Sequence, residues 1–543
     1  MVGNGNAALQ RLALPASTAV EIVCNGARAL YKAGAWLLYC GRGMAPRAVP
    51  FAATTSNRRG EMAHQQTRWA QFGVLITVFF FWGFVAASND ILIPVFKKAF
   101  DLSQAQSQLV SVAFYVAYTV GALVYFGISR ASGRDLLERI GYRNGICLGL
   151  LLSALGTLLF YPAANSNSFA LMLSGLFIVG LGFALQQIAA NPLAIVMGNP
   201  ATGAQRLTLA GGINNLGTTV GPLLVSLAIF GSVAANNDQA SIESVKIPYL
   251  VLGAAFLLVA LLLWFSAVPN RIDLDAVARD EAADAAKLAD RGSAFAYPQL
   301  ALGMLAIFLY VGVEVSTVSN LPAYLHEGLG IQTHHLAPYV SLYWASLMIG
   351  RWTGAAGAFE LGAGARRLLT LVLPFLAFGV YLAVNAIARH DVSQFFGYAG
   401  VIVVMIAAAW LSRGNPARML LYFALCGIAA LLVGMATTGK ASIIALVSVG
   451  LFCSTMWPCI FALAIAGLGR HTNQGSSLLI MMIMGGGLVS WAQGALADAV
   501  GVHASFWVGV ACFAYLAFYA LRAARALRAQ GIDLDRLAAQ GGH

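Results

Sequence analysis

Acids and amides occur inside long apolar stretches of this chain, where polar side chains are costly. Asp90 and Glu314 lie in such stretches, as do Gln187 and Asn191, which are four residues apart and therefore share one face of a helix. A dehydrated carboxylate favours its neutral form, so it can bind and release a cation as its surroundings change. An amide offers a donor and an acceptor together, which suits the hydroxyl groups of a sugar. These residues predict a pathway for a small polar solute, with acids that sense a cation.

Each of these residues also has a purely structural interpretation. Asp90 lies four residues before Pro94 and could be solvated near a helix end, while Glu314 could pair with Arg351. Amides inside a membrane also hydrogen-bond neighbouring helices. Aromatic rings can lie against the C–H faces of a sugar, although most aromatic residues at such positions only fill space. The further candidates for solute binding are Asn214, Trp82, Tyr118 and Trp457.

The elements that position these residues are expected to be membrane-spanning helices. The 543-residue chain is 59% hydrophobic and 10% charged, whereas a soluble domain has about 25% charged residues. Apolar blocks follow one another with short polar breaks, and about 20 apolar residues cross a bilayer. We therefore predict an all-α membrane protein with about fourteen transmembrane helices. The predicted spans are 70–95, 106–128, 144–161, 168–198, 207–231, 247–268, 298–321, 336–359, 367–388, 395–412, 418–437, 441–468, 476–499 and 504–523.

The basic residues predict an orientation for these helices. With the N-terminus in the cytoplasm, 21 Lys and Arg residues from position 58 onward fall on cytoplasmic segments, five fall outside, and Arg351 lies within a helix. This distribution follows the positive-inside rule. The net charge of +11 is then a consequence of topology, and no nucleic-acid partner is expected. The seven cysteines lack metal-ligand spacing, so neither a metal nor a cofactor is expected.

The chain divides into segments that differ in composition. The charged stretch PNRIDLDAVARDEAADAAKLADRGSAFAY separates six spans from eight, and the first residues match nothing that follows. We interpret them as an extension that is disordered or that precedes a true start at Met62. The predicted segments are an N-terminal extension (1–65), a six-helix bundle (66–268), a cytoplasmic linker (269–297), a C-terminal bundle (298–525) with an inserted helix pair (367–412), and a cytoplasmic tail (526–543).

An internal repeat relates the two bundles. LGFALQQIAANPLAIVMGNPATGAQRLTLAGGINNLG has a counterpart in LFCSTMWPCIFALAIAGLGRHTNQGSSLLIMMIMGGG, and WGFVAASNDILIP corresponds loosely to YVGVEVSTVSNLP. Each of the longer segments has a helix with a proline (Pro192 or Pro458), a polar loop and a Gly-rich helix. Two similar halves are typical of secondary transporters, whose solute site lies between them at the membrane midplane. The glycines at 211–212 and 485–487 are expected to let helices approach closely.

Several motifs resemble one branch of a known family. FFFWGFVAASNDILIPVFKKAF, AFYVAY, AANP, RLTLAGGINNLG, IGRWTG, WPCIFALAIAGLG and QGSSLLIMMIMGGG are similar to the sugar-porter branch of the major facilitator superfamily that includes the L-fucose–proton symporter. Within that branch the chain looks most like the bacterial glucose/galactose transporters. The resemblance covers about residues 66–525. It implies a two-bundle fold with twelve helices, so that 367–412 is an extra pair.

The resemblance also bears on single residues. Asp90 aligns with an aspartate implicated in coupling in the fucose porter, Asn214 with an asparagine of the family motif, and Trp457 with an aromatic residue before proline. Gln187 departs from the fucose porter, which has a glutamate there. Because an amide does not titrate, Gln187 carries no proton, which leaves Asp90 and Glu314 as the expected coupling acids. Sugar contacts are expected from Gln187, Asn191, Asn214, Trp82, Tyr118 and Trp457.

We therefore expect a transporter that imports a monosaccharide, with glucose or galactose favoured, by symport with a proton or sodium. It is expected to act as a monomer in the lipid bilayer of the bacterial inner membrane, with both termini cytoplasmic. The alternatives are import of fucose or N-acetylglucosamine, uncoupled facilitation, drug export, and a sugar sensor that does not transport. The sequence has no HExxH, GxSxG or nucleotide-binding loop, so an enzyme is not expected.

Overall fold

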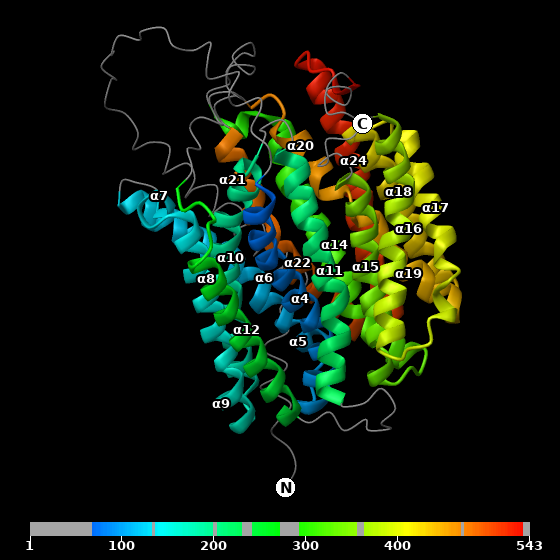
Figure 1. Cartoon of the computed structure of the whole chain (residues 1–543). Coiled ribbons are helices and arrows are strands. Elements are labelled where there is room, and N and C mark those ends of the chain that lie inside the picture. Colours follow the sequence, from blue (N-terminus) through cyan, green and yellow to red (C-terminus); the bar gives the residue numbers. More distant parts are fainter. Residues whose placement is uncertain are drawn as a thin grey trace, which may run out of the picture. The chain divides into compact units, whose positions relative to one another are not determined.

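All regular structure in the described part of the protein is helical. The computed structural model describes residues 68–132, 136–198, 203–230, 242–271, 293–355, 363–468 and 472–535, which belong to one compact unit (Figure 1). The predicted extension 1–65, residues 272–292 of the predicted linker and residues 536–543 of the predicted tail lie outside the described residues. The main helices are α4 (Trp69–Ala99), α5 (Gln104–Ser107), α6 (Leu109–Ala131), α8 (Tyr142–Leu158), α9 (Phe160–Asn165), α10 (Phe169–Val196), α11 (Gly203–Phe230), α12 (Lys246–Trp264), α14 (Pro298–Ala323), α15 (Ala337–Ala355), α16 (Ala363–Ile387), α17 (Tyr398–Ser412), α18 (Pro416–Ala436), α19 (Gly439–Cys453), α20 (Met456–Ile465), α21 (Thr472–Met481), α22 (Gly485–Val500) and α24 (Trp507–Ala529).

Twelve helical segments of the described residues are long and apolar enough to cross a membrane. The other two predicted spans, 207–231 and 336–359, fall on α11 and α15, which have 28 and 19 residues. These two helices are less apolar because they carry interior polar residues, including Asn214, Asn215 and Arg351. The all-α prediction is therefore confirmed, and the two least apolar of the predicted spans, α11 and α15, pack against each other.

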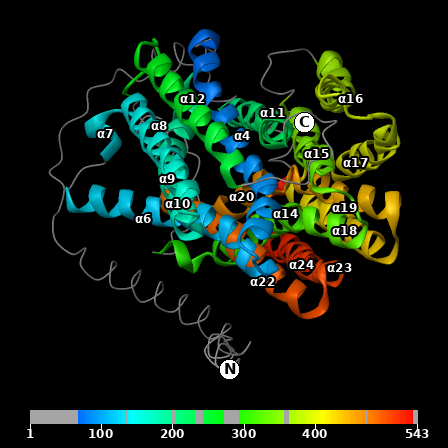
Figure 2. The ribbon, with the colours of Figure 1, turned by 90° about the horizontal axis from the view of Figure 1, so that it is seen from below.

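The helices are arranged in two groups that pack against each other along two main pairs of helices. In the first group α4 packs on α11, and α10 packs on α6 and α8; in the second, α14 packs on α20, α22 and α24. The groups meet where α11 contacts α15 and where α6 contacts α22 (Figure 2). Hydrogen bonds from Ser341 Oγ to the Thr219 carbonyl (2.7 Å) and from Trp352 Nε1 to the Gly212 carbonyl (3.2 Å) hold α15 on α11.

Glycines permit the closest of these helix contacts. A Cβ atom at Gly485 would lie 2.0 Å from the carbonyl oxygen of Phe308 in α14, and one at Gly487 would lie 2.8 Å from the Cα of Val112 in α6. A Cβ at Gly212 would lie 2.8 Å from the Trp352 ring. The prediction of close helix approach is therefore confirmed at these positions, because only a residue without a side chain fits there.

Helices α16 and α17 lie at the edge of the second group (Figure 2). They correspond to the predicted extra pair. Tyr398 of α17 shares a hydrogen bond of 2.6 Å with Ser346 of α15, and the Tyr381 hydroxyl of α16 donates to the Pro338 carbonyl at 3.2 Å. The opposite side of α16 exposes Leu368, Phe375 and Leu376, as expected for a surface in contact with lipid.

Proline interrupts the corresponding helices of the two groups differently. Helix α10 continues through Pro192, whereas the second-group counterpart is divided into α19 and α20 by a turn at residues 454–455, just before Pro458. A proline removes one helical hydrogen bond, which neighbouring groups must replace inside a membrane. At this turn the Ser454 hydroxyl donates to the Leu451 carbonyl at 2.7 Å.

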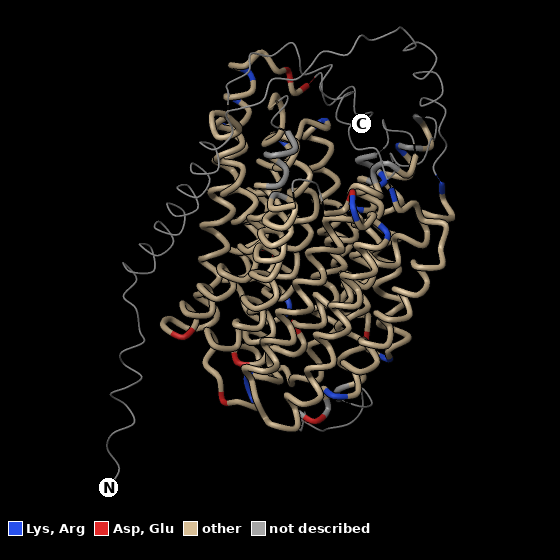
Figure 3. Tube along the Cα trace, turned by 90° about the vertical axis from the view of Figure 1, so that its left-hand side faces the viewer, with Lys and Arg blue, Asp and Glu red and all other residues tan. Residues whose placement is uncertain are grey.

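Charged residues lie mainly at the two ends of the helices, with few between them (Figure 3). The start of α4 and the end of α24 lie at the same end (Figure 1). This distribution is typical of a protein whose middle section crosses the hydrocarbon of a bilayer. It makes the few charges between the ends the natural starting point for a functional site.

Candidate functional site

Asp90 joins the two helix groups. It belongs to α4 of the first group and is 3% exposed, yet both of its carboxylate oxygens accept hydrogen bonds from the second group. Ser319 Oγ of α14 donates to Oδ1 at 3.1 Å, and Trp344 Nε1 of α15 donates to Oδ2 at 2.8 Å. Both donors are neutral. Asp90 is therefore buried at the meeting point of three helices, without a direct ion pair among the described residues.

A network of amides and hydroxyls continues from Ser319 toward the end of the molecule at which α4 ends. Ser111 Oγ of α6 lies 3.4 Å from Ser319 Oγ, and Gln108 Nε2 donates to the Ser319 carbonyl at 3.3 Å. One residue further along α14, Asn320 Oδ1 accepts a bond of 2.9 Å from Gln104 Nε2. Each of these bonds connects one helix group to the other.

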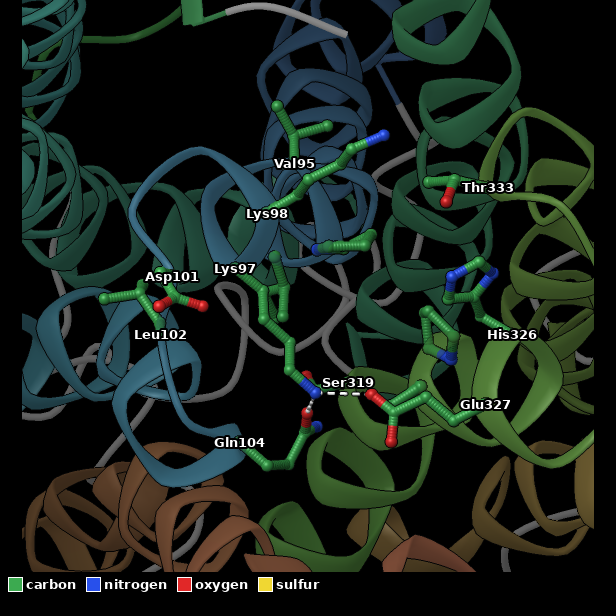
Figure 4. A pocket seen from close by; sticks show the side chains of 14 residues that line it. Val95, Lys97, Lys98, Asp101, Leu102, Gln104, Ser319, His326, Glu327 and Thr333 are labelled. Atoms are coloured by element: carbon green, nitrogen blue, oxygen red, sulfur yellow. Dashed lines mark hydrogen bonds and ion pairs between the residues drawn. The ribbon is translucent and has the colours of Figure 1, made fainter. Parts of the chain in front are cut away.

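A pocket of about 420 Å³ lies beside this network. We call it the Lys97 pocket; its lining includes Lys97, Gln104, Ser319, His326 and Glu327. Figure 4 shows the Lys97 ammonium between the Gln104 and Glu327 side chains: it donates to Gln104 Oε1 at 2.9 Å and forms an ion pair with Glu327. The pocket is thus bordered by a salt bridge between the groups, and Ser319 separates it from Asp90.

The neighbouring glutamines of α10 have different surroundings. Gln186 is fully buried; its Oε1 accepts from Trp82 Nε1 at 2.7 Å and its Nε2 donates to Ser153 Oγ at 3.0 Å. Gln187 is only partly buried, and its Nε2 donates to the Tyr118 hydroxyl at 3.1 Å. Gln186 therefore connects α4, α8 and α10, while Gln187 leaves its carbonyl oxygen for another partner.

The remaining candidate solute-binding residues of the first group differ in how many of their polar atoms already form hydrogen bonds. Trp82 is 4% exposed, and its N–H is taken by Gln186. Asn214 of α11 is partly buried and donates to the Phe79 carbonyl of α4 at 2.9 Å. Asn191 is also partly buried, one helical turn after Gln187. Asn191, Asn214 and Gln187 thus retain polar atoms that a solute could contact, whereas Trp82 offers only its ring.

Glu314 lies in the second group, in the electrostatic field of a basic residue. Arg351 of α15 acts on its charge without a direct ion pair between the two, and Arg351 Nη1 donates to Asn215 Oδ1 of α11 at 3.1 Å. Three buried polar atoms here have no hydrogen-bond partner among the described residues: Glu314 Oε2, the Tyr310 hydroxyl oxygen and Asn215 Nδ2. Unpaired buried groups cost about 1–3 kcal/mol each, so these atoms suit a site that a polar ligand completes.

Aromatic side chains border this part of the molecule. The Trp457 ring of α20 lies 6.2 Å from the Tyr310 ring and is stacked on Phe461 at 6.3 Å. Tyr115 of α6 stacks on Tyr118 at 6.3 Å, and the charges of Asp90 and Glu314 both act on it. Tyr115 therefore connects the surroundings of Gln187 and Tyr118 with those of the two acids. We call the linked surroundings of Gln187, Tyr118, Tyr115, Asp90 and Glu314 the polar region. Trp457 borders it through Tyr310, while Asn214 bonds the Phe79 carbonyl and Trp82 is engaged with Gln186.

The sequence reasoning did not identify Ser319 and Trp344, the two partners of Asp90. A signal for Ser319 was present, because SNDILIP in α4 and SNLP in α14 occupy corresponding positions of the two halves. Corresponding segments of an internal repeat meet near the axis that relates them. Trp344 has no comparable signal, since tryptophan is common in apolar helices.

Comparison with known proteins agrees with this architecture. A family model described as the Major Facilitator Superfamily matches residues 72–409. A glucose/galactose transporter of Brucella abortus is 36% identical over 451 residues, covering 82% of this chain and 92% of the relative. An L-fucose–proton symporter of Escherichia coli is 30% identical over 470 residues, covering 83% of this chain and 92% of the relative.

A solved structure shares the fold. It is that of the transporter FucP in the outward conformation, which matches with a TM-score of 0.53 and 27% identity, covering 83% of this chain and 98% of that chain. A putative glucose/galactose transporter of Helicobacter pylori is also similar, at 31% identity over 461 residues, 83% of this chain and 96% of the relative.

Proposed function

Because the chain belongs to the major facilitator superfamily, we propose that it imports a monosaccharide, glucose or galactose, by proton symport. The relatives that bear on the sugar are the glucose/galactose transporters, and the relative that bears on the ion is an L-fucose–proton symporter. The family and these relatives are transporters, not enzymes. A sugar is therefore moved without being chemically changed.

The observation that carries the proposal is the environment of Asp90. A buried carboxylate with two neutral donors, and no direct ion pair in the described part of the chain, is costly when charged, so its charge changes easily when the surroundings change. Both oxygens already accept N–H or O–H donors, an arrangement that suits a proton better than a sodium ion, which needs several oxygen ligands. We therefore assign proton coupling to Asp90.

Glu314 takes a different role in this proposal. Arg351 supplies a positive charge nearby, which offsets part of the cost of burying a charge on Glu314. The free Oε2 atom then accepts a hydrogen bond from a sugar hydroxyl, and the hydrogen bond of a charged acceptor is a strong one. Asp90 senses the proton, and Glu314 binds the sugar.

The sugar lies between the helix groups in this proposal. Gln187, Asn191 and Asn214 contact its hydroxyl groups from the first group, beside the Tyr118 hydroxyl. Trp457 lies against its apolar face from the second group, while Trp82 supports the first-group wall. The amide at position 187 favours glucose or galactose over fucose, since it holds a donor and an acceptor and no titrating charge.

Transport follows from rocking of the two bundles, residues 66–268 and 298–525, around this site. The protein is multi-pass, and we propose that it lies in the bacterial inner membrane as a monomer with both termini cytoplasmic. The basic residues support this orientation, because most of them then face the cytoplasm. The Lys97 pocket opens to the outside in that arrangement.

Uptake into proteoliposomes tests the proposal. Labelled glucose is offered under an imposed proton gradient or an imposed sodium gradient, with unlabelled galactose, fucose and N-acetylglucosamine as competitors. We expect accumulation above equilibrium with the proton gradient alone and the strongest competition from galactose. Accumulation driven by sodium, stronger competition by fucose, or uptake that never exceeds equilibrium would each contradict a stated part of the proposal.

A further inference from the structure

We propose that the proton reaches Asp90 from the Lys97 pocket through the Ser319 hydroxyl and binds Oδ1, while Trp344 keeps Oδ2 unprotonated. This inference rests on the proton symport proposed above. It states from which side the proton reaches Asp90 and which carboxylate oxygen accepts it. It also assigns positioning roles to Ser319 and Trp344.

The position of Ser319 supplies the first argument. Asp90 and Ser319 are both buried, at 3% and 1% exposed, but only Ser319 is among the residues that line the pocket. The Ser319 hydroxyl also donates to Asp90 Oδ1 at 3.1 Å. A proton that leaves the pocket for Asp90 therefore meets Ser319 first. A serine hydroxyl is suited to this transfer because it can donate and accept at the same time.

The chemistry of the two donors decides which oxygen accepts the proton. An indole N–H is a donor only, so a proton on Oδ2 would face the Trp344 N–H and break the 2.8 Å bond. The Ser319 hydroxyl can instead reverse its direction and accept from a protonated Oδ1. Its own hydrogen then has an acceptor in Ser111 Oγ at 3.4 Å. Oδ1 can thus be protonated without losing a hydrogen bond.

The transfer conserves protons at each atom. Ser319 passes its hydroxyl proton to Asp90 Oδ1 and takes one from solvent in the pocket, so that the serine is unchanged and Asp90 becomes neutral. In the reverse direction Oδ1 returns the proton to Ser319, which releases one to the pocket. No other reactant is needed.

The charged and titratable groups around the proposed proton path do not interrupt it. Near Asp90 these are Tyr115 of α6 and Tyr343 of α15, and the Tyr343 hydroxyl donates to the Glu314 carbonyl at 2.7 Å. The groups in the pocket are Lys97, Lys98, Asp101, His326 and Glu327. Lys97 and Glu327 form a pair and offset each other's charge. None of these side chains hydrogen-bonds the Asp90 carboxylate, so Ser319 remains the polar contact between the pocket and Oδ1.

Matched substitutions at Ser319 test the relay. Ser319→Thr and Ser319→Val have nearly the same shape, but only threonine keeps a hydroxyl. Two rates are measured in proteoliposomes: proton uptake driven by a sugar gradient, followed with a trapped pH dye, and sugar counterflow, which needs no net proton movement. We expect valine to reduce proton uptake at least tenfold with counterflow within about twofold of the parent, and threonine to keep both.

The outcomes separate this inference from the proposed function. If the parent protein shows no sugar-driven proton uptake, the proton symport proposal is wrong. If the parent couples and Ser319→Val couples equally well, the relay is wrong. Where both larger residues abolish counterflow because they do not fit, Ser319→Ala replaces valine against the parent, and the same two rates decide.

Trp344→Phe tests the assignment of Oδ2 with an independent readout. Phenylalanine keeps an aromatic ring but removes the N–H that stabilises the charged carboxylate. The variant should hold the proton more tightly, so the pH dependence of uptake moves to higher pH, by about one unit for a loss of one charge-assisted hydrogen bond. A profile that stays at the parent's position, with normal sugar KM, overturns the role of Trp344.

Discussion

Single residues in this protein acquire different roles from small differences in position. Gln186 and Gln187 are neighbours, but Gln186 has both amide atoms engaged in buried hydrogen bonds, whereas among the described residues Gln187 bonds only through its Nε2. Successive residues of a helix point about 100° apart. One glutamine therefore joins helices and the next faces the polar region, and the two roles can be separated by mutation.

We predict that Gln186→Ala lowers stability and that Gln187→Ala lowers sugar affinity. The first change leaves the buried Trp82 N–H without its acceptor, at a cost of about 1–3 kcal/mol. The Ser153 hydroxyl loses the Gln186 donor but keeps its own bonds to the Gly149 and Val179 carbonyls. The second removes a proposed sugar contact and one partly buried bond to Tyr118. Thermal unfolding in detergent and the KM for glucose uptake distinguish them. Equal losses of Tm in both variants would contradict the division of roles.

Glu314 and Asp90 provide a second comparison between residues. Glu314→Gln is expected to raise the KM for glucose about tenfold, because a charged acceptor becomes a neutral amide, while accumulation under a proton gradient persists at saturating sugar. Asp90→Asn is expected to abolish accumulation and to keep counterflow. Initial rates over a range of glucose concentrations, with and without the gradient, measure both. Loss of accumulation in Glu314→Gln at saturating glucose would return a coupling role to that residue.

Whole elements are positioned by how closely their backbones approach. Helix α22 lies against α14 and α6 at its first glycines, and this contact sets where Tyr115 meets the second group, since a Cβ at Gly486 would lie 3.0 Å from Tyr115 Cδ1. Helices α16 and α17 differ, because they pack on α15 from the edge and contribute no residue to the polar region. Elements in the middle of the fold should therefore be less tolerant of change than this peripheral pair.

A glycine comparison tests that difference. Gly485→Ala would place a Cβ 2.0 Å from the Phe308 carbonyl oxygen, whereas a Cβ at Gly379 of α16 meets no atom within 4 Å. We expect Gly485→Ala to destabilise the protein by more than about 2 kcal/mol, with reduced yield of monodisperse protein. Gly379→Ala should leave the Tm unchanged or slightly higher. Similar Tm values for both variants would show that α14 and α22 separate more easily than the structure indicates.

The whole molecule is held together near Asp90 by bonds that cross between the helix groups. Lys97–Glu327, Gln104–Asn320 and Asp90–Trp344 all join the first group to the second at the end of the molecule that carries the Lys97 pocket. Rocking around a central site requires this end to open, so these bonds must break in each cycle. An added covalent connection there should stop transport.

Cross-linking tests this requirement. Cysteines at positions 97 and 327, joined by a reducible bifunctional thiol reagent, should block uptake, and reduction should restore it. Arg418 and Asp535 form an ion pair within the second group, so the corresponding cysteine pair serves as the matched control and should transport normally when joined. The parent chain is treated in the same way to control for its own cysteines; among those of the described residues, Cys426 is the one that is only partly buried. Full uptake by the joined 97–327 pair would exclude opening at this end.

The sequence by itself determined the membrane architecture, since the cost of burying charge in lipid and the length of an apolar run are local properties of the chain. It also identified the polar residues of the interior and the repeat that relates the halves. Only the tertiary structure decided their partners: that Asp90 meets Ser319 and Trp344, that Gln186 holds Trp82, and that Arg351 reaches Asn215. Partners more than 100 residues apart depend on how each helix is rotated against its neighbours, and neither composition nor periodicity fixes that rotation.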